Sequence, residues 1–174
     1  MRPEIKIKDI MVNKLETIGS SSNAQDAAKK MSDKQISSVL VIDDTAGNPL
    51  GIVTERDLVR KVCVSDKSSK ELEVGQVMSS PLITINANLS PSYAADLMLR
   101  HKVRHLLVVT PKSDYDKDIR ESNESDFELI GIITPMDFTR FDVSDAISDQ
   151  HIDNYEDSVV EGILKHYRDD FNFA

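Results

Sequence analysis

Two Thr-x-x-Asp strings are the part of the sequence best suited to chemistry. Thr54 and Asp57 form the first string, and Thr134 and Asp137 form the second. A threonine followed three residues later by an acid matches a capping box at a helix N-terminus, here with Asp in place of Glu. The strings are therefore predicted to begin helices. A carboxylate held at such a position could also accept ligand hydroxyls, and the two roles are compatible.

No catalytic constellation accompanies these strings. The sequence shows no Gly-rich phosphate loop and no cluster of metal ligands, and its one cysteine, Cys63, cannot form an internal disulfide. We therefore expect no enzyme activity, no obligatory cofactor and no metal site. Cys63 falls in an apolar predicted helix, where we expect a small buried hydrophobe.

An internal repeat places the two strings in equivalent positions. Shifting the sequence by 67 residues aligns Ile7–Met11 with Val74–Met78. Further along, a shift of 80 residues aligns Gly51–Thr54 with Gly131–Thr134, so the second copy holds 13 extra residues at one place. A repeat of this kind indicates two copies of one structural unit.

Each copy is predicted to fold as strand, helix, strand, strand and helix. In the first copy the elements are Thr17-Ile18, a helix capped by Asn23, Val39–Ile42, Leu50–Thr54 and a helix from Glu55 to about Val64. The second copy replaces the hairpin turn with an acidic insert, residues 112–128. A half of about 60 residues buries little surface alone, so we expect the halves to pack about a pseudo-twofold axis.

Three segments follow from this pattern: repeat 1 with the N-terminal segment and linker (1–70), repeat 2 with its insert (71–141), and a tail (142–174). The tail carries apolar residues at helical spacing, and its other faces are acidic; the apolar residues are Ile152, Tyr155, Val159, Ile163 and Tyr167. We predict an acidic amphipathic helix that packs on its own module or a dimer mate, with partner binding as the alternative.

The net charge of −9 is concentrated in two segments. The insert contributes −4 and the tail −7, so the remainder carries +2. The sequence has no dense Lys/Arg cluster with interleaved aromatics and no tryptophan, so nucleic-acid binding is not expected. No apolar run approaches the roughly 20 residues of a membrane span and no signal peptide is visible, so we expect a cytoplasmic protein without membrane contact.

The repeated strings resemble the CBS (cystathionine beta-synthase) domain. The residues that carry the resemblance are Lys8–Met11, Ile36–Asp43 and Gly51–Leu58 in the first copy, and Val103–Val109 and Gly131–Phe138 in the second. Together they resemble a CBS pair, or Bateman module, over roughly residues 5–141. The resemblance implies an α/β (α+β) fold of two tandem β-α-β-β-α repeats, to which the tail would add a C-terminal helix.

The resemblance also implies a regulatory module that binds adenosine-containing ligands, namely AMP, ADP, ATP or S-adenosylmethionine, in clefts between the two repeats. Asp57 and Asp137 would accept the ribose hydroxyls, and Thr54 and Thr134 would lie near the phosphate. The other implied ligand contacts are Thr17, Ile18, Ile36, Ser37, Ser38, Arg56, Thr84, Ile85, Val103, Arg104 and His105. Of these, the arginines and the histidine are cations suited to phosphate.

The two copies are chemically unequal. Glu55-Arg56 in the first corresponds to Pro135-Met136 in the second, and Ser37-Ser38 corresponds to Arg104-His105. We therefore expect two different sites. The leading hypothesis is a stand-alone sensor in which an adenosyl ligand changes repeat packing or dimerisation and an effector protein responds. The resemblance implies a homodimer. The alternative is a ligand-free interaction module that works through protein–protein contacts.

Overall fold

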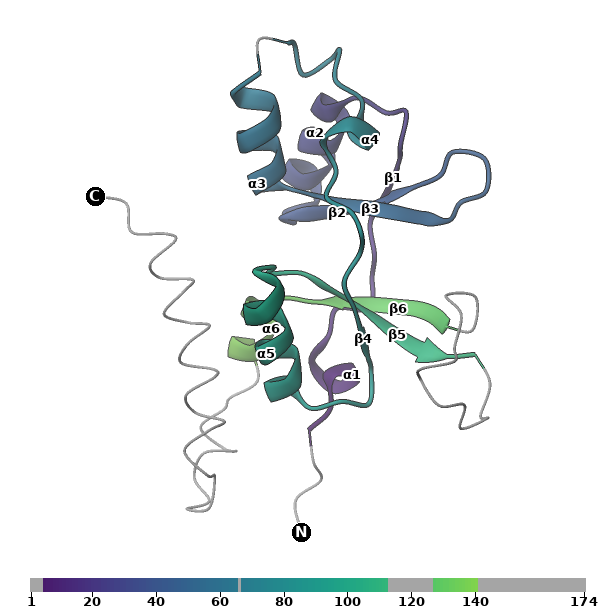
Figure 1. The fold of residues 1–174 in the computed structure, drawn as a ribbon, viewed down its shortest axis with the longest axis vertical. Coiled ribbons are helices and arrows are strands. Elements are labelled where there is room, and N and C mark those ends of the chain that lie inside the picture. The colour runs from purple at the N-terminus through teal and green to yellow at the C-terminus, as the bar shows by residue number, and fades with distance from the viewer. Residues whose placement is uncertain (1–4, 66, 113–126, 141–174) are drawn as a thin grey trace, which may run out of the picture. The chain divides into compact units, whose positions relative to one another are not determined.

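A computed structural model of the protein describes residues 5–65, 67–112 and 127–140 (Figure 1). The chain divides into two compact units, which are described separately. The first-repeat unit comprises Leu15–Leu82, and the second-repeat unit comprises Met1–Lys14 and Ile83–Ala174. The tail and most of the acidic insert, on which two of our predictions fall, lie outside the described residues.

The first-repeat unit is a three-stranded sheet with helices. Its elements are β1 (Thr17–Gly19), α2 (Ala24–Lys34), β2 (Ser38–Ile42), β3 (Pro49–Thr54), α3 (Glu55–Asp57), the π-helix η1 (Leu58–Cys63) and α4 (Val74–Val77). The strand order is β1-β2-β3, with β1 parallel and β3 antiparallel to β2. Asn23 caps α2 as predicted, since its side chain accepts a bond from the N–H of Asp26.

The second-repeat unit repeats this plan. Its elements are α1 (Ile7–Ile10), β4 (Thr84–Asn86), α5 (Pro91–His101), β5 (Leu106–Pro111), β6 (Phe127–Ile133) and α6 (Pro135–Arg140). The strand order is β4-β5-β6, again with a parallel pair followed by an antiparallel pair. The predicted order of strand, helix, strand, strand and helix is therefore confirmed in both units. Two short helices, α1 and α4, were not predicted.

The leading helix of each repeat belongs to the other repeat's unit. Val12, which follows α1, exchanges backbone hydrogen bonds of 2.9 and 3.0 Å with Ile132 of β6. Ser79, which follows α4, exchanges bonds of 2.8 and 3.0 Å with Ile52 of β3. The compact units consequently differ from the predicted segments 1–70 and 71–141, because each leading segment adds to the sheet of the opposite repeat.

The repeated glycines of β3 and β6 make this exchange possible. A Cβ atom on Gly51 would lie 2.7 Å from the sulfur of Met78 and 2.8 Å from the carbonyl oxygen of Ser79. A Cβ atom on Gly131 would lie 2.7 Å from the carbonyl oxygen of Val12. Each glycine is therefore required because a backbone segment of the other repeat approaches the strand closely.

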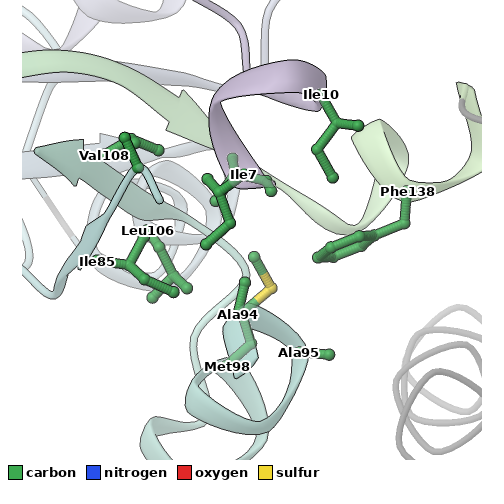
Figure 2. Close-up of a cluster of buried hydrophobic side chains, with 11 residues drawn as sticks. Ile7, Ile10, Ile85, Ala94, Ala95, Met98, Leu106, Val108 and Phe138 are labelled. Atoms are coloured by element: carbon green, nitrogen blue, oxygen red, sulfur yellow. The ribbon is translucent and has the colours of Figure 1, made fainter. Parts of the chain in front are cut away.

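The core of the second-repeat unit anchors helix α6 (Figure 2). The ring of Phe138 on α6 is directed toward Ala94 and Met98 of α5, and it lies beside Ile10 of α1 (Figure 2). All four side chains are buried. Phe138 follows Asp137 directly, so the same packing that buries the ring fixes the start of the helix on which the acid lies.

Helix η1 and the end of the insert depart from our predictions. Cys63 is exposed rather than buried, and Val59 and Val64 are 58% and 79% exposed. The prediction that Cys63 is a small buried hydrophobe is therefore wrong. At the insert, β6 begins at Phe127, so the last two residues assigned to the acidic insert belong to a strand.

Candidate ligand-binding site

Three hydroxyl residues lie at one end of the first-repeat sheet. The starts of β1 and β2 and the end of β3 share this end, because β1 and β2 are parallel and β3 is antiparallel. Thr17 begins β1, and the register pairs Ser38 of β2 directly with Thr54 of β3. The carbonyl of Ser37 accepts a 3.0 Å bond from the N–H of Glu55, which ties the start of β2 to the helix start.

The second-repeat sheet gathers the corresponding residues at the same end. Thr84 begins β4, and Leu106 of β5 pairs with Ile133 of β6. His105 directly precedes Leu106 and Thr134 directly follows Ile133, so both residues lie at the same end of the strand pair. In each unit the structure thus brings together strand starts and a Thr-x-x-Asp string that are distant in the sequence. Their contact with a ligand stays a prediction.

Both Thr-x-x-Asp strings form capping interactions. In the first-repeat unit, Asp57 Oδ2 accepts the backbone N–H of Thr54 at 3.0 Å and its hydroxyl at 2.6 Å. In the second-repeat unit, Asp137 Oδ2 accepts both donors of Thr134 at 2.8 Å. The predicted capping role is confirmed in both repeats, and it leaves each acid almost fully buried, at 8% and 2% exposed.

The second carboxylate oxygen of Asp57 is also engaged. Its Oδ1 atom accepts the hydroxyl of Ser79 at 2.7 Å and lies 3.0 Å from the Nζ atom of Lys61. Lys61 in turn donates to the carbonyl oxygens of Val77 and Met78 at 2.8 and 2.9 Å. These contacts tie η1 to the segment that follows α4.

This environment keeps Asp57 ionised. Burial raises the pKa of Asp57, but the hydrogen bonds from Thr54, Ser79 and Lys61 together outweigh that desolvation, so its pKa lies below the ordinary value of 3.8. The carboxylate is therefore a charged acceptor at neutral pH, which is the form that binds hydroxyl donors most strongly.

The surroundings of Asp137 differ in kind. The β-bridges place Val12 opposite Ile132 where Ser79 stands opposite Ile52, so a valine replaces the serine hydroxyl. The shift of 80 residues places Phe141, outside the described residues, at the position of Lys61. Neither residue can supply the hydroxyl or the ammonium that engages Oδ1 of Asp57. The two repeats therefore surround the same motif with different chemistry.

The predicted apolar contacts contribute to the cores. Ile18 and Ile36 are partly buried against the core of the first-repeat unit, and Val103 packs in the same way in the second-repeat unit. Ile85 is only 3% exposed and belongs to the second-repeat core. Its side chain packs among its neighbours in that core, and its contact with a ligand stays a prediction.

The predicted cations occupy different positions in the two repeats. Arg56 is half-buried at the first-repeat helix start, where the second repeat has Met136, which is 56% exposed. Arg104 and His105 are half-buried just before β5. A cation thus comes from the helix start in one unit and from the strand start in the other, which matches the inequality of the two sequences.

Two residues at the first-repeat sheet end were not predicted. Lys30 of α2 donates to the carbonyl oxygen of Thr17, and its Nζ atom lies 3.7 Å from a carboxylate oxygen of Glu16. These contacts fix the start of β1 next to the helix. The sequence offers no pattern for this pair, because Lys30 and Glu16 are brought together only when α2 folds back over β1.

Lys61 and Ser79 were also missed, for different reasons. Lys61 lies four residues after Asp57 in a predicted helix, which is the spacing of a helical ion pair and could have been noticed. Ser79 reaches Asp57 only through the exchange of leading segments. The sequence around Ser79 does not indicate this contact. Val12 occupies the equivalent position in the other repeat.

The described residues contain no group of three or more His, Cys, Asp and Glu side chains arranged to hold a metal ion. Within the same residues, none of the helices has the length and apolar character needed to cross a bilayer.

The chain is thus a tandem pair of small α/β domains. Each domain holds a buried aspartate whose carboxylate accepts a hydrogen bond from the hydroxyl of a threonine. The chain belongs to the CBS domain family, whose model matches residues 7–63 and 74–144. An uncharacterized protein of Methanocaldococcus jannaschii is 30% identical over 155 residues, which cover 76% of this chain and 37% of that relative. The chain spans about half or less of the length of the first curated relatives that it matches.

Solved structures share the fold. A CBS domain protein of Thermoplasma acidophilum has a TM-score of 0.70 at 19% identity, covering 94% of this chain and 76% of that one. A hexameric CBS-CP12 protein from bloom-forming cyanobacteria has a TM-score of 0.65 at 25% identity, covering 95% and 83%. The likeness to the first bears on fold alone, and it agrees with the predicted pair of α/β repeats.

Proposed function

We propose that this chain is a regulatory protein that binds an adenosine-containing ligand, such as AMP, ADP, ATP or S-adenosylmethionine, at its Thr-x-x-Asp sites. The observation that carries the proposal is the pair of buried carboxylates, Asp57 and Asp137, each held by its threonine at the end of a sheet. One carboxylate can accept both vicinal hydroxyls of a ribose through charge-assisted bonds. The regulatory character implied by the CBS resemblance supports the same role.

The rest of the ligand would meet residues at the same sheet ends. In the proposal, the phosphate faces Arg56 in one unit and Arg104 and His105 in the other. The base contacts the partly buried apolar residues beside the strand starts, Ile36 and Val103. The two sites would therefore differ in ligand preference, because the cations approach from different elements.

The test is a panel of ligands measured by thermal unfolding and calorimetry. A ligand at 100 times its dissociation constant stabilises the protein by about 2.7 kcal/mol. Asp57→Ala or Asp137→Ala should lower the affinity roughly 10- to 100-fold in at least one case, because the ribose loses a charged acceptor that the hydroxyls cannot replace.

Asp9→Ala is the matched control. Asp9 occupies the equivalent capping position of α1 and accepts the backbone N–H of Lys6 at 2.8 Å, but it is exposed. Its substitution should leave the ligand-induced increment intact. If both site variants kept the full increment as well, capping would explain the acids and the ribose assignment would fail.

In the proposal, the ligand acts by changing repeat packing or assembly, and an effector protein responds to that change. We propose a homodimer as the ground state. The cyanobacterial neighbour is hexameric, which supports assembly as a property that such chains use. Light scattering after gel filtration, with and without AMP, measures the assembly directly. A monomer under both conditions would overturn the dimer and leave the binding proposal standing.

The second candidate function is a ligand-free interaction module. It is favoured by two exposed apolar residues, Val59 of η1 and Val64 directly after it, which are 58% and 79% exposed. This function predicts no stabilisation by any ligand of the panel. It also predicts that Val59→Ser and Val64→Ser change the mass of the assembly, whereas Asp57→Ala does not.

A further inference from the structure

The Asp57 carboxylate already has a full set of donors from its own unit. Oδ2 accepts the N–H and the hydroxyl of Thr54 at 3.0 and 2.6 Å. Oδ1 accepts the hydroxyl of Ser79 at 2.7 Å and lies 3.0 Å from Nζ of Lys61. A carboxylate offers about four lone-pair positions. A ribose can therefore bind Asp57 only by replacing some of these donors.

The replaceable donors are the two on Oδ1. The Thr54 contacts belong to the helix start, and they persist as long as α3 is formed. Ser79 is exposed, and the side chain of Lys61 is 41% exposed, so water can solvate both groups when they leave the carboxylate. Replacing these two donors with ribose hydroxyls therefore costs less free energy than breaking the hydrogen bonds from Thr54 at the helix start.

Both of these donors also take part in contacts that hold residues 77–79 in place. Ser79 bridges to Ile52 of β3 through two backbone hydrogen bonds, and Lys61 holds the carbonyl oxygens of Val77 and Met78. Three residues after Ser79, at Leu82, the chain leaves the first-repeat unit. The Oδ1 contacts thus fasten the last segment of this unit to the candidate ribose acceptor.

We propose that Ser79 and Lys61 form an internal latch on Asp57, and that a ribose binding in the first-repeat unit displaces it. The inference rests on the proposed function and adds how that site is regulated. Displacement loosens residues 77–82, the segment that connects the two units in the chain. Ligand binding at the first-repeat site thereby alters the segment that links the two units in the chain.

The second repeat has other residue types at the two latch positions. Val12 stands in the place of Ser79, and Phe141 corresponds in the sequence to Lys61. A ribose at Asp137 meets no competing serine hydroxyl or lysine ammonium from these two positions. The first-repeat site is therefore expected to be weakened by the side chains of Ser79 and Lys61, and these two side chains have no counterparts of the same kind in the second repeat.

The affinity test uses the Asp137→Ala protein, in which the first-repeat site is the one under study. Ser79→Ala and Lys61→Met are added singly, and adenosine is titrated by calorimetry because it lacks a phosphate that Lys61 could contact. Each variant should bind adenosine roughly 5- to 10-fold more tightly, since one competing hydrogen bond has been removed. Lys67→Met is the control, because Lys67 is an exposed lysine of the same unit.

Hydrogen exchange in the otherwise wild-type protein gives a second measurement. The amides of Ile52 and Ser79 bond to each other's carbonyls, so their exchange rates report the bridge. Lys61→Met should speed both amides severalfold and leave the amide of Val53, in the buried strand, unchanged. Saturating adenosine should speed the same two amides in the protein without substitutions.

The outcomes separate this inference from the proposed function. Tighter binding in both latch variants, or binding that appears only in them, supports the latch. Adenosine binding that is equal or weaker in Ser79→Ala and Lys61→Met overturns the latch, while the proposed function stands. If none of the proteins binds adenosine, AMP, ADP, ATP or S-adenosylmethionine, the proposed function fails and the latch fails with it.

Discussion

The two units hold the same Thr-x-x-Asp cap in different surroundings. In the first-repeat unit, Asp57 accepts the hydroxyl of Ser79 and pairs with Lys61. In the second-repeat unit, Val12 stands at the place of the serine and Asp137 is the more deeply buried acid, at 2% against 8% exposed. Ser79 and Val12 come from the exchanged leading segments, whereas Lys61 lies on η1, four residues after Asp57. A repeated motif thus takes its chemistry from the residues around it, both on its own helix and on the segment that packs against it.

Substitution of the two equivalent glycines tests a feature that the units share, which is the close approach of the exchanged segment to the last strand of each sheet. Gly51→Ala and Gly131→Ala should each destabilise the protein by about 2–3 kcal/mol, because each new Cβ atom would lie within 2.8 Å of a backbone carbonyl oxygen. Urea unfolding of both variants gives the two free energies. A loss in only one variant would show that the exchanged segments are not held equally in the two units.

A double-mutant cycle tests a difference between the units, which is the serine hydrogen bond to the aspartate in the first repeat. In the first-repeat unit, Asp57→Ala and Ser79→Ala should show a coupling free energy of about 1–2 kcal/mol, because the two side chains share a 2.7 Å charged hydrogen bond. The corresponding cycle in the second-repeat unit, Asp137→Ala with Val12→Ala, should show a coupling near zero, since valine has no donor. Comparable couplings in both cycles would remove the distinction between the units.

Acid unfolding sharpens the same comparison. The pKa of Asp57 is lowered in the folded protein, so the unfolded chain binds more protons there. The contribution of Asp57 is complete above about pH 3.8 and is lost as the pH falls through the folded pKa. As the pH falls from about 4.5 through the folded pKa, the wild-type protein should lose more stability than Asp57→Asn.

The measurement is urea unfolding at a series of pH values. Asp43 and Asp44 also have lowered pKa values, through backbone N–H groups of the Thr45-Ala46 turn and of Ser21 respectively. Their contributions are common to both proteins and cancel in the difference. Parallel curves for wild type and Asp57→Asn would contradict the account of the Asp57 contacts.

The repeat and its element order could be predicted from the sequence, because strands and helices follow local patterns. The continuous apolar run Val39–Ile42 indicated a buried strand, and Asn23 indicated a helix start; both are confirmed. The exchange of α1 and α4 could not be predicted. Ile7–Met11 and Val74–Met78 occupy equivalent positions in the sequence, and nothing local says which sheet each one joins.

The candidate site was predicted only as far as its local motif extends. The Thr-x-x-Asp spacing predicted the Thr54 and Asp57 contacts, which form within four residues of chain. Ser79 was missed because its contact spans 22 residues and depends on the exchange. Ile85 packs in the core of the second-repeat unit, and its predicted contact with a ligand stays a prediction.

The smallest effect should come from the third capping acid, Asp9. It accepts the backbone N–H of Lys6 at 2.8 Å, as Asp57 and Asp137 do for their threonines, but it is exposed and begins a helix of only four residues. Water can replace the lost acceptor, so Asp9→Ala should cost about 0.5 kcal/mol in urea unfolding. Asp57→Ala should cost more, because it also releases Ser79 and Lys61. If Asp9→Ala cost as much as Asp57→Ala, capping alone would account for the stability effect, and the extra contacts of the first-repeat unit would carry no free energy.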